Sequence, residues 1–267
     1  MPRSPAALGR RVLKHPSGIL LVVQLLGVLL YPSMQQTVVG RVAFEAFGVL
    51  VLTLAIWSVR DSAGRTSIAI ALGILGSVFS ITDAVQHSAG LELAGWVFHA
   101  LFYFWAAGNL MAYMLHDNKV TTDELFAIGA TFTLGAWAFA YVFMILQHLQ
   151  PGSFTAAVDP EGQRTWMQLL FLSFTNLSST GLSDIVPIAD HARSVVMIQQ
   201  LAGLGYVALF VSRLVGLTIG RRMDSAAGNQ LAPTPSDAAG PQEVGPSVRE
   251  AGSADDVAAA DPPSPRS

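Results

Sequence analysis

The chain has 267 residues, of which 52% are apolar and only 12% charged, with a formal net charge of −3 and no cysteine. The charged fraction is about half that of an average soluble protein. The lack of cysteine excludes disulfide-stapled domains, cysteine zinc sites and thiol redox chemistry. The balance of 15 Lys and Arg against 18 Asp and Glu disfavours a nucleic-acid partner. Residues 125–158 carry no charge at all, which is typical of segments in a lipid bilayer.

Six segments are apolar and close to the length of about 20 residues that a membrane-crossing helix needs. In chain order they are Ser17–Tyr31, Val42–Val59, Ser67–Val85, Leu91–Leu115, Glu124–His148 and Ala192–Gly220. A further apolar run, Thr165–Leu177, is too short to span, and we expect a re-entrant or buried helix there. The pattern Thr121-Thr122-Asp123-Glu124 is that of a capping box, which predicts the start of the fifth helix.

Basic residues predict the orientation of the chain. Nine Lys and Arg residues flank the segments on one side and three flank them on the other. The nine are Arg3, Arg10, Arg11, Lys14, Arg60, Arg65, Lys119, Arg221 and Arg222; the three are Arg41, Arg164 and Arg193. Because short loops rich in Lys and Arg stay in the cytoplasm, both termini are expected there, which fits six crossings. We therefore expect a multi-pass protein of the plasma (inner) membrane, in contact with lipid.

The two ends of the chain differ from its middle. The basic start and first apolar run resemble a signal peptide, but no small-x-small cleavage site follows, so we expect a retained helix. From Asp224 the chain is rich in Ala, Pro, Gly, Ser and Asp and has no aromatic residue, which favours disorder. The predicted organisation is a cytoplasmic basic segment (1–16), a four-helix transmembrane domain (17–118), a domain built around the short apolar run (119–223) and a disordered cytoplasmic tail (224–267).

The residues after the short apolar run are small and polar, although we expect them inside the membrane. The sequence over residues 174–187 reads FTNLSSTGLSDIVP. Non-helical backbone at membrane depth is tolerated only where it is buried in protein or lines a watery cavity. Its carbonyl oxygens can replace the hydration shell of a cation, and the C-terminal end of the short helix favours positive charge. This pattern favours a pore loop over an ordinary polar loop.

The order of outer helix, short pore helix, filter, aspartate, proline and inner helix resembles the pore domain of tetrameric potassium channels, from Glu124 to about Arg222. The family filter reads T-x-G-Y-G-D, where this chain has Ser179-Thr180-Gly181-Leu182-Ser183-Asp184. The resemblance implies a homotetramer, because one loop per chain cannot enclose a conduction path. It also implies an assignment of site residues. The pore helix contributes Thr175, Asn176 and Ser178, the backbone carbonyls of Ser179, Thr180, Gly181 and Leu182 coordinate potassium ions, and Asp184 lies just outside the filter.

Two positions depart from the family filter. Leu182 replaces the family tyrosine, so the hydroxyl that clamps the filter to the pore helix is absent. Ser183 replaces the second glycine, which adopts a left-handed conformation in the family and costs a non-glycine residue roughly 1–2 kcal/mol. The filter is therefore expected to be wider or softer than a potassium filter. Passive conduction of cations, potassium above all, is the predicted function, and a non-selective cation channel is the alternative within this class.

The last helix carries further candidates. An ungapped continuation places Gly203 at the family's inner-helix hinge, with Gly205 close by; small-residue helix packing is an equal alternative for either one. Arg213 is expected to snorkel toward the interface or to pair at an intracellular gate. One of Gln199 and Gln200 is expected to face a partner helix or the pore helix, and a lumen-facing role is the alternative. Around the outer mouth, fourfold symmetry would gather acidic residues that concentrate cations. These are Asp159, Glu161, Asp184 and Asp190. For Asp159 and Glu161 an ordinary solvated loop is the alternative.

The first four helices stand where a voltage-sensor domain stands in six-helix channels. The fourth, Leu91–Leu115, contains Glu92 and His99 but no Lys or Arg. Moving one charge across 100 mV contributes only about 2.3 kcal/mol, so steep voltage dependence needs several charges. We therefore expect weak or no intrinsic voltage sensing.

A different class of function rests on the histidines. His99, His116 and His148 would serve a membrane-bound haem or electron-transfer subunit if two of the rings faced each other at similar depth. Histidines held by protein groups near the interface are the competing interpretation. The sequence has no Gly-x-Ser-x-Gly, His-Glu-x-x-His or phosphate-loop signature. We expect neither enzyme activity nor a cofactor beyond the permeant cation.

Overall fold

The computed structural model of the chain describes residues 15–34, 47–48, 50–51, 53–55, 63–86, 88–116 and 121–230. The chain divides after Arg221 into two units, and the first unit contains every element below except the last turns of α8. Its helices are α2 (Pro16–Met34), α4 (Ala63–Gln86), α5 (Ala89–Leu115), α6 (Thr122–Leu149), α7 (Trp166–Leu177) and α8 (Asp190–Gln230). The strands are β1 (Phe154–Ala156) and β2 (Ile185–Pro187).

The predicted helices recur with small shifts. The first, third, fourth and fifth predicted segments correspond to α2, α4, α5 and α6, each extended by a few residues. The short apolar run is α7, twelve residues long as expected for a helix that does not span. Of the second predicted segment, residues 47–48, 50–51 and 53–55 are helical, and the rest lies outside the described residues. These assignments make the chain an all-α membrane protein in its main architecture.

The last predicted helix is longer than expected. It continues to Gln230, whereas we expected it to end at Gly220 and the disordered tail to begin at Asp224. The prediction was wrong for residues 224–230, because helix propagation adds one hydrogen bond for each residue fixed and neither Pro nor Gly interrupts the chain until Gly228. The remainder of the tail, residues 231–267, lies outside the described residues.

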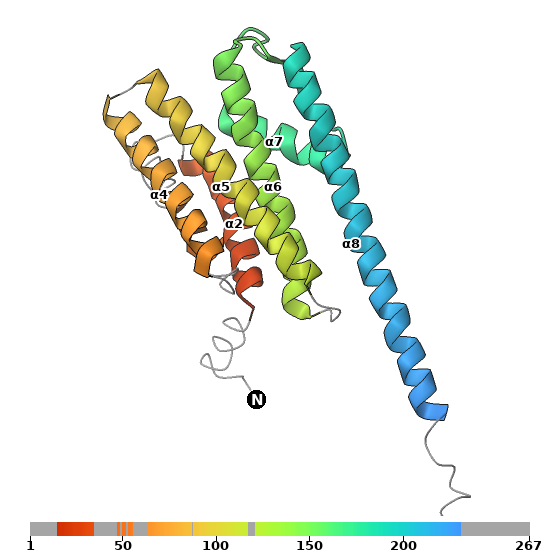
Figure 1. Cartoon of the computed structure of the whole chain (residues 1–267). Coiled ribbons are helices and arrows are strands. Elements are labelled where there is room, and N and C mark those ends of the chain that lie inside the picture. Colours follow the sequence, from red (N-terminus) through yellow and green to blue (C-terminus); the bar gives the residue numbers. More distant parts are fainter. Residues whose placement is uncertain are drawn as a thin grey trace, which may run out of the picture. The chain divides into compact units, whose positions relative to one another are not determined.

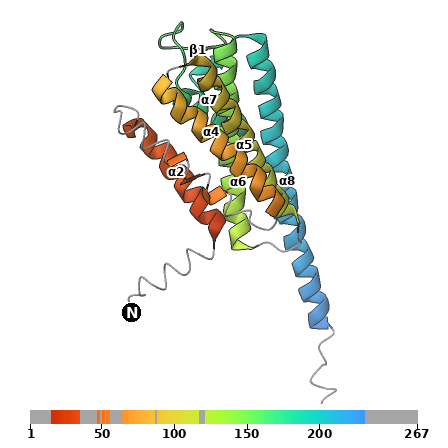
Figure 2. The same cartoon turned by 60° about the vertical axis from the view of Figure 1, so that its left-hand side comes forward.

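Three helices in the described part of the chain are long and apolar enough to cross a membrane: Pro16–Ser33 in α2, Thr122–Leu149 in α6 and Asp190–Gly216 in α8. A shorter apolar stretch lies in α4, at Ser67–Asp83. Helix α4 packs on α5, α5 on α6, and α2 on α6; Figures 1 and 2 show α4, α5 and α6 running alongside one another.

An aromatic cluster joins the N-terminal helices to the short helix. Trp166, the first residue of α7, lies 4.9 Å from Tyr31 of α2 and 5.6 Å from Trp137 of α6, measured between ring centroids. Tyr103 of α5 packs edge-on against Trp137 at 5.5 Å. Buried aromatic pairs of this kind add about 0.5–1.5 kcal/mol each beyond their area burial. The cluster therefore fixes where α7 begins relative to α2, α5 and α6.

The two strands form a small antiparallel sheet that was not predicted. Its register pairs Phe154 with Pro187 and Ala156 with Ile185. Each strand has three residues, too short to show an alternation of apolar and polar positions. The sheet ties the segment after α6 to the segment that leads into α8, and so it fixes the end of the connection between α7 and α8.

Candidate functional site

Helix α7 is held at both ends and along its length. Its first turn has a capping box, in which the Thr165 hydroxyl accepts from the Gln168 N–H and the Gln168 side chain accepts from the Thr165 N–H. The T-x-x-Q pattern was present in the sequence but was not used in the prediction. Ser173 donates its hydroxyl to the Ala136 carbonyl of α6 at 2.7 Å. The short helix is thereby fixed to the outer helix of the domain.

Two glutamines of α8 bind α7, whereas the sequence led us to expect such a contact for one of them. The Gln199 side-chain amide donates to the Ser173 carbonyl at 3.1 Å and to its hydroxyl at 2.6 Å. The next residue, Gln200, donates to the Asn176 side-chain oxygen at 3.4 Å. Gln199 and Asn176 are both buried. Since buried polar groups need hydrogen-bond partners, these hydrogen bonds specify how α8 lies against α7. Helix α7 stands between α6 and α8 (Figure 1).

The two glycines of α8 considered as a hinge, Gly203 and Gly205, have different surroundings. A Cβ atom added at Gly203 would lie 2.0 Å from the Leu177 carbonyl oxygen, at the end of α7, whereas a Cβ at Gly205 would meet nothing within 4 Å. Gly203 is therefore a close-packing position, where α8 touches the last residue of the short helix. The predicted hinge role of either glycine stays a prediction.

The chain after α7 forms a tight loop around one carbonyl group. The Thr175 carbonyl accepts the backbone N–H of Thr180 at 3.0 Å and that of Gly181 at 3.1 Å. The hydroxyls of Ser178 and Thr180 donate to the same oxygen, each at 3.3 Å. These bonds are the local reason that the chain reverses directly at the end of the helix. They bring Ser179, Thr180 and Gly181 beside Thr175.

Several oxygens of this loop have no hydrogen-bond partner in the described part of the chain. Within the described residues, the backbone carbonyls of Ser179, Thr180 and Leu182 accept no hydrogen bond. These residues are exposed in the single chain, Leu182 to 78%. The loop carries no charged side chain before Asp184, which is also exposed. An exposed loop of free carbonyl oxygens in a membrane protein has the chemistry of a cation-coordinating surface.

The backbone conformation of the loop differs from the expectation at Ser183. Among the described residues that are not glycine, only Asp159 and Ser179 have a positive φ, of 51° and 58°, and Gly181 has a φ of 68°. Ser183 is therefore not left-handed, and the predicted strain at this residue is absent. The reason is local hydrogen bonding: the Ser183 N–H donates to the Gly181 carbonyl, and its hydroxyl accepts from the Ile185 N–H, both at 3.1 Å.

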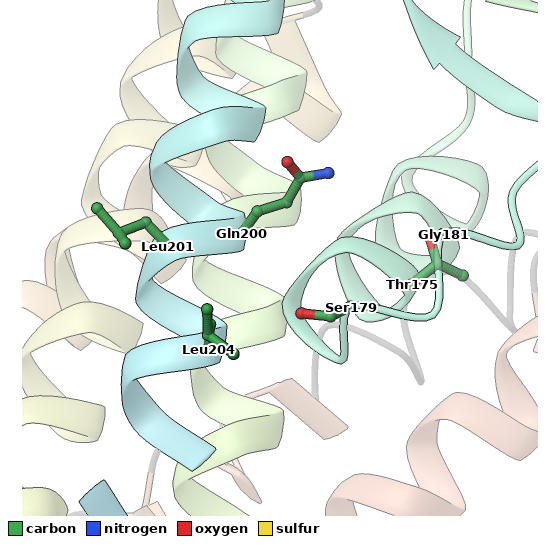
Figure 3. A pocket seen from close by; sticks show the side chains of 6 residues that line it. All are labelled: Thr175, Ser179, Gly181, Gln200, Leu201 and Leu204. Carbon is green, nitrogen blue, oxygen red and sulfur yellow. The ribbon is translucent and has the colours of Figure 1, made fainter. Parts of the chain in front are cut away.

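A cavity of about 400 Å³ lies between this loop and α8. Its walls are Thr175, Ser179 and Gly181 on the loop side and Gln200, Leu201 and Leu204 on α8. Figure 3 shows Gln200 reaching toward the loop, with Leu204 one turn further along α8. The cavity combines hydroxyl and amide groups with an apolar wall and contains no charged residue.

The acidic residues that the sequence led us to expect at the outer mouth are held in different ways. Asp190 lies 3.8 Å from Arg193 in an exposed ion pair, so part of its charge is neutralised. The loop that carries Asp159 is organised by the buried Arg164, whose guanidinium donates to the carbonyls of Val158, Asp159 and Gly162. The Gln147 side chain of α6 in turn donates to the Arg164 carbonyl and accepts from the Arg164 N–H. Arg164 is thus a structural residue, which sequence reasoning treated only as an orientation signal.

A second polar cluster lies at the start of α6. Thr121 caps this helix by accepting from the Glu124 N–H at 3.2 Å, as the capping-box pattern predicted. The Glu124 carboxylate lies 3.6 Å from the Arg213 guanidinium of α8, and both side chains are largely buried. The neighbouring Asp123 accepts the Ser17 N–H at 3.1 Å and the Ser17 hydroxyl at 2.8 Å. The adjacent carboxylates of Asp123 and Glu124 therefore hold α2 and α8 at the start of α6. We call Ser17, Asp123, Glu124 and Arg213 the inner junction.

Two of the three candidate histidines have aromatic neighbours in the structure. His99 is buried; its Nδ1 donates to the Gly95 carbonyl at 2.8 Å, and its ring stacks on Tyr141 at 5.1 Å. His148 packs edge-on against Trp96 at 5.6 Å. Among the described residues, no cluster of three His, Asp or Glu residues is arranged to hold a metal ion. The surroundings of His99 and His148 are those of histidines packed against protein groups.

Residues 128–219 match the family model described as "Ion channel". The resemblance to a potassium-channel-like pore domain is thus confirmed for this part of the chain, which contains α7, the loop after it and most of α6 and α8. It supports an ion-channel function for a membrane protein of this kind. No curated protein and no solved structure matches the chain significantly.

Proposed function

We propose that the protein is a channel that passively conducts monovalent cations, potassium first among them, across the plasma membrane. The loop of residues 179–182 carries the proposal, because the Ser179, Thr180 and Leu182 carbonyls accept no hydrogen bond from any described residue and lie just after a short re-entrant helix. The ion-channel match over residues 128–219 supports it. In the full topology we propose six spans with both termini in the cytoplasm, and α7 enters from the outer side.

Conduction requires several copies of the chain. We propose a homotetramer, in which the loops of four chains surround one axis and each carbonyl position becomes a ring of four oxygens. Two surfaces of the single chain support self-association. The loop of residues 178–182 is exposed, and α8 exposes large apolar side chains that other copies or lipid would cover. The most exposed are Met197, Ile198, Leu201 and Leu204, at 61–72%.

The inner junction supports a place for the gate. Glu124 and Arg213 join the outer and inner helices of the pore domain at the end of α6 that we assign to the cytoplasm. Because α8 lines the conduction path in this proposal, a change in that ion pair changes the position of α8 at the inner mouth. We propose that the pair holds α8 against α6 in the closed channel.

Potassium efflux from liposomes tests the proposal. Purified protein in potassium-loaded vesicles should release potassium down its gradient, and the variant Gly181→Pro should abolish this flux. Proline fixes φ near −65° and has no N–H, whereas Gly181 has a φ of 68° and donates its N–H to Thr175. The control is Gly152→Ala, which also alters a glycine of positive φ but lies outside the loop.

The outcomes separate conduction from assembly. Equal flux through the wild type and Gly181→Pro, with both forming tetramers in size-exclusion chromatography, would contradict a conduction path through this loop. An absorbance scan tests the other class of function, because a Soret band in the purified protein would favour a haem subunit instead of a channel.

A further inference from the structure

We call residues 179–184 the filter loop. One of the carbonyl oxygens that the proposed coordination path needs is hydrogen-bonded within this loop. The Gly181 carbonyl accepts the Ser183 N–H at 3.1 Å, so it points back toward its own loop. The carbonyls before and after it, those of Thr180 and Leu182, accept no hydrogen bond within the described residues. The series of free carbonyls from residue 179 to 182 is therefore interrupted at its third position.

Ser183 makes this turn through two of its groups. Its N–H binds Gly181, and its hydroxyl accepts the N–H of Ile185 at 3.1 Å. Ile185 is buried and begins β2, whose pairing with β1 fixes it in place. The outer end of the loop is thus attached to the small sheet by a side chain that glycine does not have.

We propose that Ser183 determines the ion specificity of the channel, by turning the Gly181 carbonyl away from the conduction path. This proposal rests on the proposed function. In a tetramer, a cation between two successive rings exchanges its water for oxygens of both rings. Only Ser179 and Thr180 then supply adjacent rings, and Leu182 supplies an isolated one. A cation in the outer half keeps part of its hydration shell, so the channel discriminates only weakly between potassium and sodium.

Substitution of Ser183 by glycine or alanine separates the effect of the serine hydroxyl from that of its Cβ on the backbone conformation. Ser183→Gly removes the hydroxyl and also permits a left-handed backbone, which frees the turn to open. Ser183→Ala removes the hydroxyl equally but keeps a Cβ, which disfavours the left-handed conformation. The alanine variant is therefore the matched control, with the same bond to Ile185 lost and the backbone preference retained.

The experiment measures reversal potentials in planar bilayers, with potassium on one side and sodium on the other, for the wild type, Ser183→Gly and Ser183→Ala. The wild type should favour potassium by less than about tenfold, a reversal potential within ~59 mV of zero. Ser183→Gly should raise the permeability ratio by about tenfold, a further shift of ~59 mV. Ser183→Ala should stay within about twofold of the wild type, a shift below ~18 mV.

Three results would overturn the proposal. The first is a wild-type preference for potassium of about a hundredfold or more, and this measurement does not depend on either variant folding. The second is an unchanged permeability ratio in Ser183→Gly. The third is an equal rise in both variants, because it would assign the effect to the hydroxyl bond with Ile185 and not to the turned Gly181 carbonyl. Complete absence of current in the wild type, with tetramers present, would instead contradict the proposed function, and this inference with it.

Discussion

The filter loop and the inner junction are both polar regions of the described chain, but they satisfy their polar groups in opposite ways. In the loop, the Ser179, Thr180 and Leu182 carbonyls accept no hydrogen bond among the described residues. At the junction, each carboxylate is buried and bound, Glu124 to Arg213 and Asp123 to Ser17. A free oxygen is available to a passing ion, whereas a bound charge holds helices together. The contrast supports the proposed conduction through the loop, whereas the junction connects helices.

The largest expected effect comes from breaking the buried ion pair of the junction. Glu124→Ala leaves Arg213 without this carboxylate, and removing one partner of a buried pair costs about 3–5 kcal/mol. We expect a lower thermal unfolding midpoint in detergent, together with a higher open probability in bilayers. The measurements are circular dichroism melts and single-channel recording.

A matched control uses the exposed pair at the other end of α8. Asp190 and Arg193 lie 3.8 Å apart with exposed side chains, and surface pairs contribute only about 0–1 kcal/mol. Asp190→Ala should therefore leave the unfolding midpoint almost unchanged. Equal losses in Glu124→Ala and Asp190→Ala would contradict the special role of the junction.

The next effect concerns the attachment of α2 to α6. Ser17→Ala removes the hydroxyl that donates to the Asp123 carboxylate at 2.8 Å, and a hydrogen bond to a charged group contributes about 1.5–3 kcal/mol. We expect the unfolding midpoint to fall by less than in Glu124→Ala. Faster hydrogen exchange of the first turn of α2, with exchange in α7 unchanged, would locate the loss at this contact; no change in α2 exchange would count against it.

A smaller effect is expected where α8 meets the end of α7. Gly203→Ala places a Cβ 2.0 Å from the Leu177 carbonyl oxygen, and overpacking of this kind costs about 1–3 kcal/mol. The shift of α8 or α7 should reduce conductance as well. Gly205→Ala has open space around its Cβ and should behave as the wild type, so similar defects in both variants would argue for a hinge instead of a packing role.

The smallest effect should come from the outer mouth. Asp184 is exposed just beyond the filter loop, and a ring of four such carboxylates would raise the local cation concentration. Asp184→Asn should lower the conductance at low ionic strength and have little effect above about 1 M salt, where the Debye length is about 3 Å. An equal reduction at both salt concentrations would indicate a structural role.

The helices and the pore helix were predictable from the sequence, whereas the conformation of the loop was not. Apolar runs with few charged residues defined α5, α6 and α7 to within a few residues, and Thr121 correctly indicated the start of α6. Ser183 was expected to be strained because the family has glycine there. Its hydrogen bonds to Gly181 and Ile185 depend on where the loop reverses, and that reversal depends on the Thr175 carbonyl.

Contacts between distant parts of the chain were the other limit. The pairing of Glu124 with Arg213 requires knowledge of how α6 crosses α8, which neither residue shows locally. The alternatives for Arg213 were snorkelling and pairing at a gate, and the structure shows a pair without testing the gate. The strands β1 and β2 were missed because three residues carry no periodicity, although Ile185 of β2 is the anchor of the filter loop.

Recording from purified protein in planar bilayers under a potassium chloride gradient tests the central claim most directly. The account predicts single-channel currents whose reversal potential follows the potassium gradient and which disappear in Gly181→Pro tetramers. Currents that follow the chloride gradient, or no current from wild-type tetramers, would contradict it.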